Sequence, residues 1–108
     1  MAQRTWRKVT SGGSSRLFGR LASLVRGIAV VFAAILIVHI LLFMGSANPS
    51  NGITKFFADV AEPLALGFKD LFTLSDPRAA VLVNYGLAAI FWLVVGALLA
   101  RVLRRFAR

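Results

Sequence analysis

The 108-residue sequence contains no cysteine, a single histidine and only four acidic residues. Without cysteine, the chain has no disulfide framework, thiolate metal site, thiol nucleophile or covalently attached haem. The four acids, Asp59, Glu62, Asp70 and Asp76, lack the spacing of a recognised cation loop, and basic residues lie among them. We therefore expect a solvated helix face there. The sequence predicts a non-catalytic protein with no metal and no cofactor.

Long polar stretches are also missing, since 58% of the residues are hydrophobic and the mean hydropathy is +0.78. Ordinary soluble domains carry roughly 45 to 50% apolar residues. The apolar runs 27–44 and 79–100 are too long for the core that a chain of this size can build. As helices they measure about 27 and 33 Å, enough to cross a bilayer. The predicted fold is an all-α integral membrane protein, a two-helix transmembrane hairpin.

A cleaved signal peptide is the competing interpretation of the first run. A basic segment precedes this run, and the small residues Gly45, Ser46 and Ala47 follow it. The run has 18 residues, however, whereas the apolar part of a signal peptide has about 7 to 15. We therefore expect a membrane span.

Charge predicts the topology. The two chain ends carry ten basic and no acidic residues, whereas 45–78 carries three basic and four acidic ones. Cytoplasmic flanks collect Lys and Arg, so we expect both termini in the cytoplasm and the connection on the other side of the membrane. The predicted parts are a basic segment 1–26, a first span 27–47, an outer segment 48–76, a second span 77–103 and a basic tail 104–108.

The net charge of +9 also raises nucleic-acid binding. The basic residues bracket the spans, and no nucleic-acid motif is present, so we expect anionic lipid headgroups as their partner. Within 16–26, apolar residues recur at helical spacing between arginines. This stretch forms either a separate amphipathic helix on the headgroups or the first turns of the following span.

The outer segment is too apolar for an ordinary loop. From Ile53 to Phe72, apolar residues recur at helical spacing with charged residues between them, and Pro63 should kink or split the helix. We predict an interfacial amphipathic helical segment lying flat on the outer leaflet. A re-entrant segment would need polar shielding of its backbone, for which the sequence shows no signal. The aromatic candidates for packing on a partner are Phe56, Phe57, Phe68 and Phe72.

The second span begins at a clear helix-start signal. Ser75 or Asp76 can accept from free backbone N–H groups, and Pro77 fits the first helical turn. Trp92 lies in the middle of this span and not at an aromatic belt, so we expect it to face a protein neighbour.

His39 and Asn84 are the polar side chains at matching depth in the two spans, which suggests a hydrogen bond between them. His39 alternatively finds water or a carbonyl; ligation of haem or quinone lacks a second ligand. On the other side of the second span lies a seam of small residues, Gly86, Ala89, Gly96 and Ala100. If this seam packs on the first span, Asn84 turns away. Either arrangement leaves one interface for another membrane subunit or a second copy.

The stretch from Asn48 to Leu64 resembles the YggT family of small bacterial membrane proteins. It has an Asn48-Pro49 turn, an aromatic helix and a Glu62-Pro63-Leu64 step, although the residues that follow depart from the family pattern. The resemblance covers about 27–100. It implies a non-enzymatic envelope protein linked to cell division, osmotic tolerance or the assembly of membrane components, with no catalytic residue carried over.

We therefore expect a small bacterial inner-membrane protein that acts by helix packing in envelope organisation or membrane-protein assembly. The alternative is an accessory subunit of a larger respiratory or transport complex, docked through its phenylalanine-rich outer helix. A channel is disfavoured because neither span carries a polar stripe.

Overall fold

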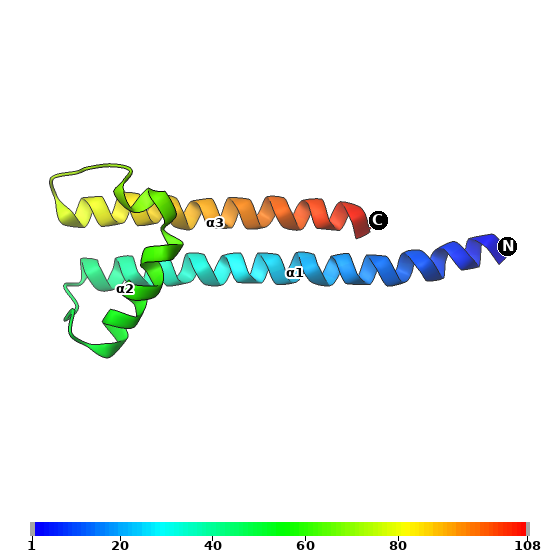
Figure 1. Ribbon diagram of the computed structural model, residues 1–108, viewed down its shortest axis with the longest axis horizontal. Coiled ribbons are helices and arrows are strands. Elements are labelled where there is room, and N and C mark those ends of the chain that lie inside the picture. The colour runs from blue at the N-terminus through cyan, green and yellow to red at the C-terminus, as the bar shows by residue number, and fades with distance from the viewer. Residues whose placement is uncertain (1, 108) are drawn as a thin grey trace.

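The computed structural model describes the backbone of residues 2–107 and the side chains of residues 16–106, and this part of the chain is helical. Its elements are α1 (Ala2–Met44), α2 (Gly52–Leu64), the short 3-10 helix η1 (Leu66–Asp70) and α3 (Pro77–Ala107). The helices α1 and α3 lie side by side and antiparallel, while α2 crosses them obliquely near one end (Figure 1). The molecule is a rod of 68 × 28 × 17 Å.

The two long helices keep one register along their whole contact. Ser46 meets Arg78 at the outer end, and the rings of Phe18 and Phe106 meet at the other end. The intermediate pairs are His39 with Tyr85, Phe32 with Trp92, and Ala29 with Gly96. This register defines the level of every residue along the rod.

Helix α1 is continuous through residues 16–26, so these residues belong to the same helix as the first candidate span and do not form a separate helix. Ala22 is completely buried, and Phe18 contacts Phe106 at a ring distance of 5.7 Å. The hairpin therefore extends beyond the level of Arg26 and Arg101.

The helix ends follow from local hydrogen bonds. At the end of α1, Ser46 adopts a left-handed φ of 57°, and the amide of Ala47 donates to the carbonyl of Leu42. This is the geometry of a Schellman motif, here without the usual glycine. At the start of α3, the Asp76 carboxylate accepts from the Arg78 amide at 3.1 Å, which confirms the predicted helix start.

Small residues let α1 and α3 approach closely. Of the predicted seam, Ala89, Gly96 and Ala100 are buried, and Gly96 lies directly against Ala29. Gly86 lies at the edge of the contact, since a side chain there would meet no atom within 4 Å. The small-residue seam is thus used within the chain.

Both long helices have the length and composition of membrane spans, over Arg16–Met44 and Pro77–Phe106. Only 22% of the most apolar stretch of each is buried within the molecule, and exposed leucine, isoleucine and valine side chains cover the rest of the surface. The prediction of two long apolar helices in an all-helical chain is confirmed.

The outer segment divides near Pro63, as predicted. α2 continues through Pro63 to Leu64, and the chain turns at Leu66, whose φ is 54°, into η1. Helix α2 packs on α1 and η1 packs on α3. The predicted flat position on a membrane surface is not confirmed, because the segment lies against the flank of the hairpin (Figure 1).

Gly96→Val should destabilise the hairpin, because its side chain would collide with Ala29 across the helix contact. We expect the free energy of unfolding to fall by about 1–3 kcal/mol, measured by detergent-induced unfolding followed by circular dichroism. Gly86→Val is the matched control, since open space surrounds Gly86. Equal losses in the two variants would contradict this helix contact.

Candidate functional site

The corner between α2 and η1 contributes to the hydrophobic core of the molecule. Ala61, in the last turn of α2, and Ala65, directly after this helix, are completely buried. They belong to one cluster with four residues of the long helices, Ala33, Leu36, Ala88 and Ala89. Five of these six side chains are alanine, so the bend can approach both helices closely.

Asn84 anchors η1 and the residues after it to α3. Its side-chain oxygen accepts from the Phe72 amide at 3.0 Å, and its side-chain nitrogen donates to the carbonyls of Phe72 at 2.9 Å and Lys69 at 3.2 Å. Asn84 is only 3% exposed. Its amide group therefore supplies hydrogen-bond partners to backbone groups at and after the end of η1, where a regular helix no longer supplies them.

Trp92 anchors the end of α2 in the same way. Its indole N–H donates to the Leu64 carbonyl at 2.7 Å, a carbonyl at a helix end without an intrahelical partner. Its ring also packs edge-on against Phe32, at 4.9 Å between centroids. The neighbour that Trp92 faces belongs to the same chain.

The two anchors lie at different depths along the hairpin, since Asn84 is seven residues and Trp92 fifteen residues after Pro77. Trp92 comes nine residues before Arg101, so its backbone lies about 22 Å from the level of Pro77 and about 14 Å from the level of Arg101. The bend thus reaches the middle of the two candidate spans. Asn84 and Trp92 supply the backbone shielding that a re-entrant segment needs and that the sequence did not reveal.

His39 and Asn84 do not pair. The His39 ring packs against the Tyr85 ring at 4.8 Å, while all hydrogen bonds of the Asn84 side chain go to the outer segment. The small-residue seam packs on α1, so Asn84 points away from α1. It points toward the outer segment of the same chain. The interface that we expected to remain free on this side of α3 is therefore occupied.

A recess of about 860 Å³ opens between the outer end of α1 and the starts of α2 and α3. Its polar lining includes His39, Lys55, Asp76 and Arg78. Arg78 donates to the Ser46 hydroxyl at 2.6 Å. His39 and Asp76 are the side chains there that could hold a metal, and among residues 16–106 no three His, Asp or Glu side chains come together.

Charged side chains surround the outer face of the bend, and we call Asp59, Glu62, Lys69 and Asp70 the charged corner. Lys69 donates to the Glu62 carboxylate at 3.1 Å and so links η1 to α2. The hydrogen bond and the charge of Glu62 raise the pKa of Lys69. Asp59, Glu62 and Asp70 are exposed, and the corner carries three acids against one base.

The four predicted phenylalanines divide into two kinds. Phe68 packs on Phe91 at 5.3 Å, and Phe57 is half-buried beside Phe56. Phe56 and Phe72 are 58% and 47% exposed. Only the latter two offer a large free aromatic surface.

The roles of Asn84 and Trp92 as backbone anchors were missed at the sequence level. The available signal was their spacing: Asn84, Ala88 and Trp92 are each four residues apart, so two donors and a small residue share one helix stripe. Such a stripe can approach the backbone of a neighbouring segment closely and donate hydrogen bonds to it. Periodicity did not indicate that this backbone belongs to the outer segment.

Asn84→Ala should loosen the outer segment without separating the long helices. Losing bonds to buried backbone groups costs about 1–3 kcal/mol, so we expect amide hydrogen exchange in 66–72 to accelerate at least about fivefold. Trp92→Phe should have the same effect around Leu64, since it keeps a ring and loses the donor. Asn48→Ala is the control, because Asn48 bonds only within its own turn. Unchanged exchange in the Asn84 and Trp92 variants would show that they are not anchors.

Comparisons with protein-family models, with curated proteins and with solved structures gave no match. The resemblance to the YggT family therefore stays a prediction.

Proposed function

We propose that the chain is a small non-catalytic protein of a bacterial inner membrane that acts by packing against another membrane protein, in envelope organisation or membrane-protein assembly. One observation carries the proposal. The charged corner flanks a bend whose backbone bonds to Trp92 and Asn84 of α3, so its charges lie beside the apolar part of the hairpin, where lipid is a poor neighbour for charge.

The free-energy argument is direct. A charged side chain at the bilayer centre costs about 2.5–3.5 kcal/mol on insertion scales. The ion pair between Glu62 and Lys69 offsets part of this cost, although the side chains are still 63% and 38% exposed. Asp59 and Asp70 add two further exposed acids. A protein surface that offers donors or cations would cover this corner far better than acyl chains.

Aromatic side chains strengthen the case for a protein partner. Phe56 and Phe72 are exposed on the same outer segment as the charged corner. Large aromatic side chains beside polar groups are typical of binding hot spots. We infer that the partner has an apolar pocket beside basic residues.

The proposed orientation places both termini in the cytoplasm. The ten basic residues of the chain ends support it. The inner ends of α1 and α3 also lie at the same end of the rod (Figure 1).

An accessory subunit of a larger respiratory or transport complex is the second candidate. It is favoured because the charged corner needs a protein partner for as long as the chain is in the membrane. An assembly protein that repeatedly leaves its partner would expose them each time.

The topology is testable with reporters fused after Arg108. We expect a reporter active only in the cytoplasm to be active, and a reporter active only outside to be silent. The opposite result would invert the orientation. A fusion within the turn at Asn48 should give the opposite pattern, with the outside reporter active and the cytoplasmic reporter silent.

The partner proposal is testable by native purification in mild detergent, with mass spectrometry of the proteins that migrate with the chain. We expect partner recovery, and we expect Asp59→Asn with Glu62→Gln and Asp70→Asn to reduce it at least tenfold. Arg20→Gln changes an exposed charge away from the corner and should leave recovery unchanged.

The outcomes separate the candidates. A fixed stoichiometric complex of enzyme subunits would support the accessory subunit and contradict the assembly role. Substoichiometric association would do the reverse. A chain that always migrates alone or as a homo-oligomer would contradict both.

A further inference from the structure

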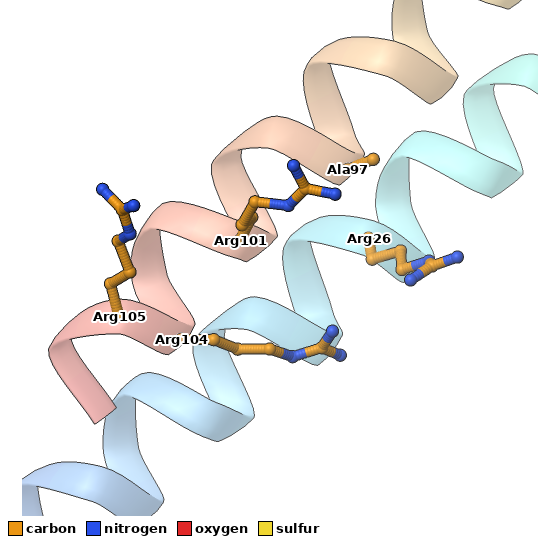
Figure 2. A pocket seen from close by; sticks show the side chains of 5 residues that line it. All are labelled: Arg26, Ala97, Arg101, Arg104 and Arg105. Carbon is orange, nitrogen blue, oxygen red and sulfur yellow. The ribbon is translucent and has the colours of Figure 1, made fainter. Parts of the chain in front are cut away.

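A cluster of arginines forms a pocket at the inner end of the hairpin. The pocket has a volume of about 490 Å³ and is lined by Ala97 and four arginines, Arg26, Arg101, Arg104 and Arg105. Figure 2 shows Arg26 on α1 beside Arg101 and Arg104 on α3, while Arg105 extends away from the others. The register of the two helices thus gathers cations that are far apart in the sequence.

These positive charges have no acidic neighbour. All four acidic residues of the chain lie between residues 59 and 76, at the outer half of the hairpin. Guanidinium groups stay charged at any physiological pH and repel one another. A bound anion with several acceptor oxygens would relieve this repulsion, and phosphate matches the forked donors of arginine.

The surroundings of the pocket identify the source of the phosphate. On α3, exposed Leu93 and Ile90 lie four and seven residues from Ala97, on the same helix face and toward the middle of the hairpin. On α1, exposed Val30 and Ile37 follow Arg26 along a similar line. An apolar strip therefore adjoins the pocket, and this arrangement matches a phospholipid, whose charged headgroup is joined to apolar acyl chains.

We propose that Arg26, Arg101 and Arg104 form a binding site for the phosphate of an anionic phospholipid of the inner leaflet, with its acyl chains along this strip. The site rests on the membrane insertion that we propose above. It lies on the side of the hairpin away from Asn84, since Ala97 and Arg104 fall on the opposite face of α3. The lipid site and the partner surface are therefore separate.

The test uses the full chain purified in mild detergent and titrated with cardiolipin, phosphatidylglycerol or phosphatidylcholine, with bound lipid counted by native mass spectrometry. We expect both anionic lipids to bind more tightly than phosphatidylcholine. Each Arg→Gln change at Arg26, Arg101 or Arg104 should weaken their binding about fivefold, the usual effect of one cation near a charged membrane surface.

Two controls distinguish a binding site of defined geometry from non-specific electrostatic attraction. Arg20→Gln removes the same charge from α1 at a residue that does not line the pocket, and binding should stay unchanged. Replacing the three arginines with lysine keeps the positive charge but removes the forked guanidinium donors. The lipid affinity should therefore fall, yet stay above that of the glutamine variants. Circular dichroism checks that each variant keeps its helices.

Equal effects of Arg20→Gln and Arg26→Gln would overturn the proposal, as would equal binding of all three lipids. Inorganic phosphate at millimolar concentration is the second arm: if it displaces the anionic lipids completely, the site belongs to a free phosphate and not to a lipid. Because this assay contains no partner, its failure would leave the partner proposal intact, and failed co-purification would leave the lipid site intact.

Discussion

The hydrogen bonds of Asn84 and Trp92 hold the bend of the outer segment against the two long helices, and the surfaces that the molecule presents depend on this position. A chain that bends back along a hairpin exposes peptide groups at the bend, and an apolar environment provides no water to satisfy them. Two side chains on one stripe of α3 satisfy these groups at Leu64, Lys69 and Phe72. Alanines at the bend then allow the close contact that keeps the bonds short.

The position of the bend determines what each surface of the hairpin can do. One flank is occupied by the outer segment, whose outward side carries the charged corner and two exposed phenylalanines. The opposite flank is free and ends at the arginine pocket (Figure 2). A partner surface and a lipid surface can therefore coexist on a chain with only two long helices.

Much of the fold followed from the sequence. Hydropathy predicted both long helices, Asp76 and Pro77 predicted the start of α3, and Pro63 predicted the division of the outer segment. These features depend on local physics, such as capping and the missing N–H of proline. Local patterns also showed that the small seam could pack on the first helix.

The site was less predictable because it depends on contacts between distant residues. Asn84 was paired with His39 by depth alone, but the helical rotation that places Gly96 against Ala29 turns Asn84 to the opposite side. The same amphipathic pattern describes a helix on a membrane surface and a helix packed on another helix. The arginine pocket likewise arises from the register of two helices, which no single stretch of sequence contains.

The central claim is that the bend between α2 and η1 lies at the level of the middle of the two candidate spans and not at a membrane surface. The absence of cysteine allows single nitroxide labels to be introduced at Leu66, at Ile90 and at Asn48 without background, and their depth measured in bilayers by collision with oxygen and with a polar nickel complex. The account predicts that the label at Leu66 has the depth of the one at Ile90. A label at Leu66 as shallow as the one at Asn48 would contradict it.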